Sequence, residues 1–125
     1  MTGIAKALDE AVIADVAAYY AGQPQRNPNP VTLAESPGAI VQLVELGDPR
    51  RNIPPCASCH RAGAGGPIET PVLAEQRAEY LVQQLKLYGS GERRNDVYAR
   101  TRTIASKLSS SEIEGLAAYY RAGFK

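Results

Sequence analysis

Apolar residues recur at helical spacing in four segments of the chain, which predicts four helices. The predicted helices run from residue 10 to 21, from 37 towards 47, from 74 to 88 and from 109 to 120. Asp9 is placed to cap the first, and Ser109 with Glu112 forms a capping-box pattern at the start of the last. Pro37 suits the first turn of the second helix. Because no segment reads as a convincing strand, we expect an all-α fold.

Two segments lack this pattern. Residues 22–36 are rich in Pro, Asn, Gln and Gly, which favour turns and offer little to bury, so they predict a linker. Residues 48–71 are dense in Gly and Pro and predict an irregular stretch with a short helical turn of its own. Loops of that kind usually need a ligand to order them.

The chain contains an internal repeat, because residues 4–22 match residues 104–122 in register. Ile, Ala, Leu and Ile recur in step and are followed in both copies by Ala-Ala-Tyr-Tyr. One copy closes a domain, whereas the other has no domain before it in this sequence. We therefore expect residues 1–22 to be the orphan C-terminal helix of a preceding module, residues 23–36 a linker and residues 37–125 one complete domain.

Composition narrows the function classes. In the 125 residues, 14 basic side chains against 13 acidic ones give a formal net charge of +1, which argues against nucleic acid or an anionic membrane as partner. No apolar run approaches the roughly 18 to 20 residues that span a bilayer, and no leader is visible. The two cysteines lie too close together to staple distant elements.

The strongest chemical signal is Cys56-Ala57-Ser58-Cys59-His60. Two thiols at this spacing can each add to a vinyl group of protoporphyrin, and the histidine that follows can bind the iron. The motif therefore predicts one covalently bound haem c. A thioredoxin-like redox pair would need a surrounding βαβ pattern, and a structural zinc site would need further Cys or His ligands. Buried, unmodified thiols are the remaining alternative.

Residues 37–124 resemble class I cytochrome c, and most closely one module of the bacterial di-haem cytochromes c. The resemblance rests on a set of motifs in chain order: Gly47-Asp48, Ile53-Pro54-Pro55, the Cys56 to His60 motif, Pro71-Val72-Leu73-Ala74-Glu75-Gln76, Tyr80-Leu81, Gln84-Leu85, Gly91-Glu92-Arg93-Arg94-Asn95-Asp96, Ile104-Ala105, Leu108-Ser109 and Ala117-Ala118-Tyr119-Tyr120. The family implies short helices and loops wrapped around one haem, here with an extra N-terminal helix.

The resemblance also assigns roles around the haem. Pro71 matches the proline whose carbonyl accepts the Nδ1 hydrogen of the proximal histidine, with a plain turn proline as the alternative. Arg93 would approach a haem propionate unless it is a solvated surface arginine. The side chains expected to line an apolar haem crevice, or else to belong to an ordinary core, are Tyr80, Leu81, Leu85, Ile104 and Leu116.

The sequence departs from the family at the distal iron ligand. The family has a methionine three residues before the Ile-Ala pair, but this chain has Thr101, and a hydroxyl is a poor donor to ferrous iron. Its one methionine, Met1, stands three residues before Ile4-Ala5 in the first copy of the repeat. Met1 either ligates nothing or reaches an iron by folding back or by exchange between subunits.

If Met1 does not ligate, the iron is five-coordinate, water-bound or held by a side chain such as Tyr98, Asn95 or Lys107. Two smaller departures are Arg61 and Glu75, where the family pattern has glycine. They suggest local changes in the loops and altered charge beside the haem.

Three functions remain open. The leading hypothesis is single-electron transfer between redox partner proteins, without catalysis by the chain itself. The second is a haem ligand-binding or sensor module with an open or non-methionine distal site. The third is a cytochrome domain or subunit of a larger oxidoreductase, with the N-terminal helix docking on a missing cytochrome module or exchanging in a dimer. Covalent haem attachment points to a bacterial periplasm.

Overall fold

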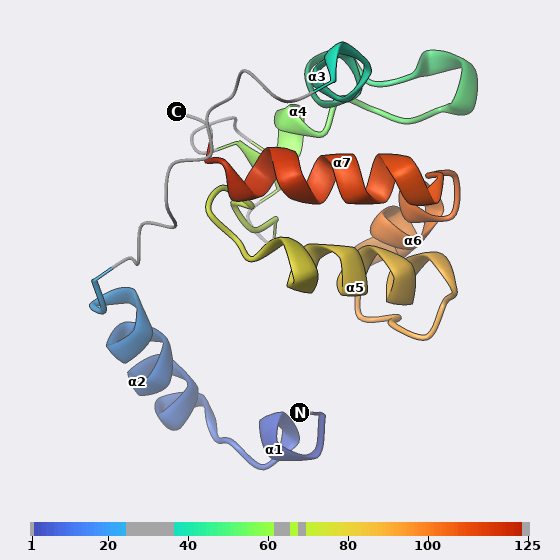
Figure 1. Ribbon diagram of the computed structural model, residues 1–125. Coiled ribbons are helices and arrows are strands. Elements are labelled where there is room, and N and C mark those ends of the chain that lie inside the picture. Colours follow the sequence, from blue (N-terminus) through green and yellow to red (C-terminus); the bar gives the residue numbers. More distant parts are fainter. Residues whose placement is uncertain (1, 25–36, 62–65, 68–69, 124–125) are drawn as a thin grey trace.

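The computed structural model describes residues 2–24, 37–61, 66–67 and 70–123, and nearly all regular structure in these ranges is helical (Figure 1). The helices are α1 (Thr2–Lys6), α2 (Glu10–Ala21), α3 (Gly38–Glu45), α4 (Ala57–His60), α5 (Ala78–Gly89), α6 (Arg100–Ala105) and α7 (Ser110–Arg121). Two 3₁₀ turns, η2 (Pro49–Arg51) and η3 (Val97–Ala99), precede α4 and α6. Within these ranges the only β contact is an isolated bridge between Asp48 and Ile53. The all-α prediction is confirmed.

The helix ends of α2 and α7 follow from their caps. In α2 the Asp9 carboxylate accepts a hydrogen bond of 2.8 Å from the backbone N–H of Val12. In α7 the Ser109 hydroxyl accepts from the N–H of Glu112 at 3.2 Å, while the Glu112 carboxylate accepts from the N–H of Ser109 at 2.8 Å. The predicted capping box is therefore present.

Other helix boundaries differ from the prediction. The helix expected from residue 74 begins only at Ala78, because Glu75 adopts a left-handed conformation with φ 65° that cannot continue a right-handed helix. Its backbone N–H instead donates to the carbonyl of Tyr120 on α7, at 2.9 Å. The short helices α1 and α6 were not predicted, and α3 begins after Pro37 rather than at it.

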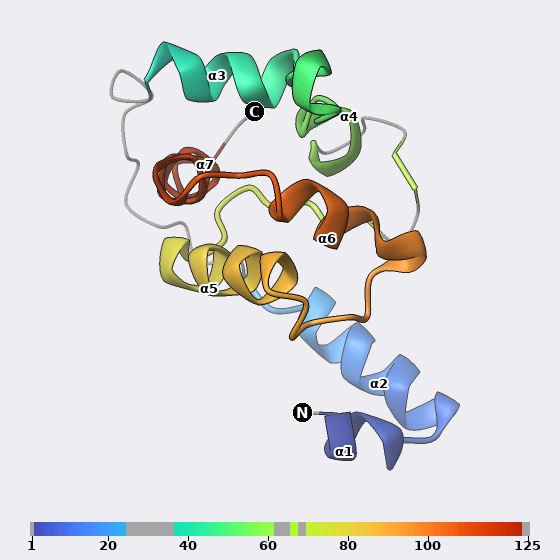
Figure 2. The same ribbon diagram turned by 90° about the vertical axis from the view of Figure 1, so that its right-hand side faces the viewer.

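The hydrophobic core forms where α7 packs against both α3 and α5. Figures 1 and 2 show α7 lying between these two helices. At the crossing of α7 with α3, a Cβ on Gly115 would lie 2.7 Å from Cδ1 of Ile40, so a larger residue would force the Ile40 side chain to shift. The core cluster consists of Ile40, Leu43, Val44, Ile53, Ala57, Leu81, Leu116, Ala117, Tyr119 and Tyr120.

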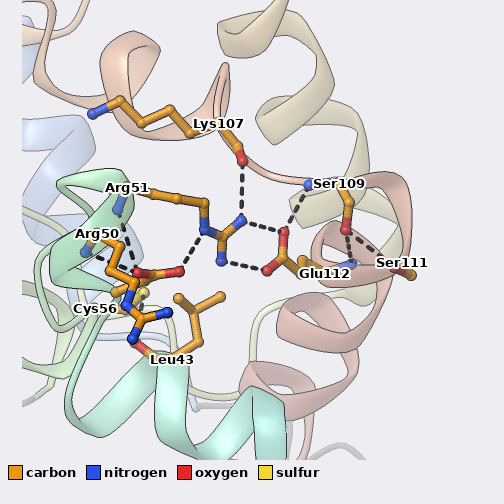
Figure 3. A network of polar contacts seen from close by, with 9 residues as sticks. Leu43, Arg50, Arg51, Cys56, Lys107, Ser109, Ser111 and Glu112 are labelled. Carbon is orange, nitrogen blue, oxygen red and sulfur yellow. Dashed lines mark hydrogen bonds and ion pairs between the residues drawn. The ribbon is translucent and has the colours of Figure 1, made fainter.

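A polar network centred on Arg51 fixes the turn that precedes the cysteine motif (Figure 3). The Arg51 guanidinium donates to Asp48 Oδ2 at 2.6 Å and, in a two-pronged contact, to both carboxylate oxygens of Glu112 at 2.6 and 3.0 Å. It also donates to the Lys107 carbonyl at 3.2 Å. Bidentate pairing of this kind is strongly directional, so η2 is held against the start of α7.

The described side chains of the N-terminal helices are all exposed. Every described side chain from Gly3 to Pro24 is exposed, including the large apolar ones on α2, namely Val12, Ile13 and Val16. These positions correspond to buried or half-buried positions of α7 in the internal repeat. The assignment of residues 1–22 to a preceding module, with 23–36 as linker, stays a prediction.

Candidate functional site

The cysteine motif lies on a single helical turn. Cys56 is the N-cap of α4, and its carbonyl accepts a hydrogen bond of 3.0 Å from the backbone N–H of His60. Residues three and four apart share one face of a helix, so Cys59 and His60 lie on the same side as Cys56. The two thiols and the imidazole of the predicted haem site therefore share one face.

The orientation of His60 is set by Pro71. Nδ1 of His60 lies 2.8 Å from the Pro71 carbonyl oxygen. Because a carbonyl can only accept, Nδ1 carries the hydrogen and the Nε2 lone pair is left for a metal. Burial lowers the pKa of His60, against a smaller opposing effect of this hydrogen bond, and so favours the neutral, ligating imidazole. The structure brings together the two residues that the sequence paired.

Burial disfavours ionisation of the Cys56 thiol. Cys56 and Cys59 are free, and burial raises the pKa of Cys56 to about 11. Its Sγ lies 3.9 Å from the carbonyl of Leu43 on α3. Reactive cysteines of thioredoxin-like pairs have a lowered pKa instead. Among the described residues, no group of three or more His, Cys, Asp or Glu side chains is arranged to hold a metal ion.

Gly66 packs directly on the motif. A Cβ at this position would lie 2.8 Å from Cα and 2.9 Å from the carbonyl oxygen of Cys59. Any larger residue would push the returning chain away from α4. The run of glycines predicted a loop here but did not single out this contact.

Arg61 connects the motif to both ends of the domain, a connection that the sequence did not reveal. Its guanidinium forms an ion pair with Glu45 on α3, and the same Glu45 Oε1 accepts from the Tyr119 hydroxyl on α7 at 3.2 Å. A small hollow is lined by His60, Arg61 and Tyr119 together with Val44, Ala57, Ala74 and Tyr120. These ion-pair and hydrogen-bond contacts link the end of α4 to α3 and, through Glu45, to α7.

Thr101, at the position where the family has its distal methionine, lies half-buried on α6. The first turn of α6 is anchored by Asp96, whose carboxylate accepts from the backbone N–H of Arg102 at 2.9 Å and from its Nε at 2.8 Å. Just before it, Tyr98 and Ala99 both have positive φ, 54° and 55°. Met1 lies outside the described residues.

The other predicted haem contacts occupy different environments. Leu81 and Leu116 are in the core, Ile104 packs half-buried against it, Leu85 is half-buried and Tyr80 is 45% exposed. Arg93 donates to Gln84 Oε1 at 2.6 Å and to Asn95 Oδ1 at 2.9 Å, with its guanidinium 4.6 Å from the centre of the Tyr88 ring. The haem contacts assigned to these side chains stay predictions.

Comparison with known proteins identifies the family. The chain is 37% identical over 67 residues to cytochrome c-554(548) of Halomonas halodenitrificans, covering 52% of this chain and 80% of that protein. The structure matches cytochrome c4 of Acidithiobacillus ferrooxidans with a TM-score of 0.76 at 28% identity, over 98% of this chain and 70% of the other. The chain belongs to the class I cytochromes c. A search against family models gives no match.

Longer cytochromes also match over almost the whole chain. The thiosulfate dehydrogenase electron acceptor of Thiomonas intermedia is 31% identical over 124 residues, covering 98% of this chain and 57% of that protein. Cytochrome c4 of Thiocapsa roseopersicina is 33% identical over 126 residues, covering 95% and 62% respectively. This class I cytochrome c therefore spans less than two thirds of the length of these curated relatives.

The cofactor of this class I cytochrome c is a covalent c-type haem, and Cys56 and Cys59 have the spacing of its attachment motif. The donors fit that group, because α4 presents two thiols and a neutral imidazole on one face. Each helix in the described ranges is too short or too polar to cross a bilayer.

Proposed function

We propose that the chain transfers single electrons through one haem c that is tethered by Cys56 and Cys59 and ligated by His60. The observation that carries the proposal is the 2.8 Å hydrogen bond between His60 Nδ1 and the Pro71 carbonyl, which leaves Nε2 free on the face that holds both thiols. When bound, the haem supplies a one-electron ferric/ferrous couple.

The protein's own residues tune that couple. The Pro71 carbonyl fixes the tautomer of His60 and makes the ring a stronger donor. Leu85 and Ile104, both half-buried, would supply apolar surface to the haem and so lower the local dielectric there, with the Tyr80 ring at the exposed edge. Arg93, held by Gln84 and Asn95, would provide a positive charge for a haem propionate.

The chain acts as a relay between redox proteins and performs no substrate chemistry itself. Its relatives include a protein named as the electron acceptor of thiosulfate dehydrogenase, which supports a role beside, or as a subunit of, a larger oxidoreductase. The periplasm is the compartment in which we place it, because haem attachment of this type is completed outside the cytoplasm.

The helix pair α1–α2 docks on a preceding cytochrome module in this proposal. Its support is the repeat, because α2 runs from Glu10 to Ala21 and α7 from Ser110 to Arg121, so both ends correspond in register. A preceding module with counterparts of α3 and α5 would bury α2 in the way that α3 and α5 bury α7. Hydrogen exchange tests this, since α2 amides should exchange fast in this chain and slowly in a longer chain with such a module. Doubled mass by light scattering would instead indicate exchange of α2 in a dimer.

The haem assignment is tested on protein produced with a cytochrome c maturation system. We expect a covalent haem that survives denaturation and extraction and cycles reversibly between ferric and ferrous forms. Cys56→Ala and Cys59→Ala should each remove one thioether bond, and His60→Ala should change the iron's spin state. Ser58→Ala, an exposed position between the two cysteines, is the matched control and should keep the wild-type spectrum. A chain that matures without covalent haem would refute the proposal.

A further inference from the structure

The distal segment of the domain offers the iron no soft ligand. The chain has one methionine, at position 1, and the position that corresponds to the family's distal ligand is Thr101 on α6. A neutral hydroxyl binds ferrous iron far more weakly than a thioether does. Any protein ligand in this region must therefore come from another side chain.

Two of the alternative donors are engaged elsewhere. The side-chain oxygen of Asn95 already accepts from the Tyr88 hydroxyl at 3.1 Å and from Arg93 at 2.9 Å. The ammonium of Lys107 donates to the carbonyl of Asn52 at 3.1 Å, while the Lys107 carbonyl accepts from Arg51. Lys107 is thus held at the η2 turn. Binding to iron would require either side chain to give up these contacts.

The third alternative donor, Tyr98, suits ferric rather than ferrous iron. Its side chain is 90% exposed, in a residue with left-handed backbone geometry. A phenol coordinates iron as the phenolate, a hard oxygen ligand that favours ferric over ferrous haem. Even if Tyr98 reaches the ferric iron, it does not compete for the reduced one.

The backbone around Thr101 is also fixed, which hinders replacement by a neighbouring residue. Asp96, whose side chain is 3% exposed, holds Arg102 through both its backbone N–H and its guanidinium. Three residues further on, Ala105 is 2% exposed and belongs to the packed interior. The Asp96–Arg102 salt bridge, which spans Thr101, and the buried Ala105 together hold the position of α6.

We propose that Thr101 leaves the distal side of the haem without a strong protein ligand, so that the ferrous protein binds small π-acceptor molecules such as carbon monoxide and nitric oxide. This inference rests on the proposed haem site. A strong proximal donor favours such ligands, and the Pro71 carbonyl provides one by accepting the hydrogen of His60. Bound ligand stabilises the ferrous form and so stops electron transfer, which makes the domain responsive to these gases.

The test uses the reduced, fully matured protein and carbon monoxide as the probe. We expect the Soret band to shift on mixing, with binding that saturates. Thr101→Met restores a thioether at the family position and should weaken carbon monoxide binding at least about tenfold. Thr103→Met, at an exposed position of the same helix, is the matched control and should bind as the wild type does.

Several outcomes would overturn the inference while leaving the haem function intact. One is a reduced wild-type protein with covalent, reversibly cycling haem that is low-spin and inert to carbon monoxide. If Met1→Leu or Tyr98→Phe then opens that inert protein to the gas, the substituted residue is the distal ligand. Equal binding by the wild type and Thr101→Met would also refute the role of Thr101. Absence of covalent haem would instead refute the proposed function itself.

Discussion

The helices α2 and α7 carry closely related sequences in opposite environments. Ile13 is 49% exposed and its counterpart Ile113 is 6% exposed, although both are isoleucines at the same helical position. The ring pairs Tyr19–Tyr20 and Tyr119–Tyr120 even share a centroid distance of 5.4 Å and an interplanar angle of 81°. Local sequence therefore determines the helix and its ring geometry, whereas burial depends on the partner surface that α3 and α5 provide for α7 alone.

The largest expected effect comes from truncating the paired isoleucines. Ile113→Ala should lower the free energy of unfolding by about 2 to 5 kcal/mol, because it opens a cavity in the core. Ile13→Ala should change it by less than about 0.5 kcal/mol, as at other exposed positions. Urea unfolding of the haem-loaded protein measures both. A comparable loss in both variants would show that α2 is buried in solution.

Enlarging a paired alanine tests the same contrast from the other direction. Ala117 is 1% exposed, so Ala117→Leu should overpack the core and cost about 1 to 3 kcal/mol. Ala17 is exposed, and Ala17→Leu should leave the unfolding midpoint unchanged within error. Thermal unfolding measures both variants, and equal unfolding midpoints for Ala117→Leu and Ala17→Leu would contradict the contrast between the two helices.

Loss of the α7 N-cap should destabilise the whole domain, whereas loss of the α2 N-cap should affect α2 alone. Ser109→Ala removes half of the capping box and should destabilise the whole domain by about 1 kcal/mol. Asp9→Ala should reduce only the helicity of α2, visible by circular dichroism, without moving the unfolding midpoint. Ser110→Ala, an exposed neighbour, serves as the control for Ser109. A change in domain stability caused by Asp9→Ala would contradict the independence of α2.

Acid should weaken the domain through a residue that α2 lacks. The hydrogen bonds from Arg51 lower the pKa of Glu112 from 4.5 to about 2, so the folded domain gains stability above pH 4.5 and loses it as the pH falls towards 2. Glu112→Gln should flatten this part of the pH profile of urea unfolding. The corresponding residue of α2 is Val12, so α2 has no counterpart of the Arg51–Glu112 pair. An unchanged profile in Glu112→Gln would assign the acid sensitivity to other carboxylates.

The features that could be predicted from the sequence are those encoded locally. Asp9 and Ser109 marked the starts of α2 and α7 because a cap acts within one turn, and the Cys56 to His60 motif marked α4 because its chemistry needs adjacent residues. The late start of α5 could not be found this way, since Glu75 takes its left-handed geometry while bonded to Tyr120 on another helix. The Arg61–Glu45–Tyr119 contacts escaped for the same reason, because their partners lie far apart in sequence.

Those Arg61 contacts make cofactor loading and folding a linked equilibrium. The residue next to the proposed iron ligand is tied to α3 through Glu45, and Glu45 is tied to α7 through Tyr119, 74 positions further along the chain. Closing that long loop costs chain entropy, which docking of the terminal helices must offset. Any ligand that holds α4 in its native geometry therefore also favours closure of the domain. By reciprocity, docking of α7 raises the affinity of the domain for the haem.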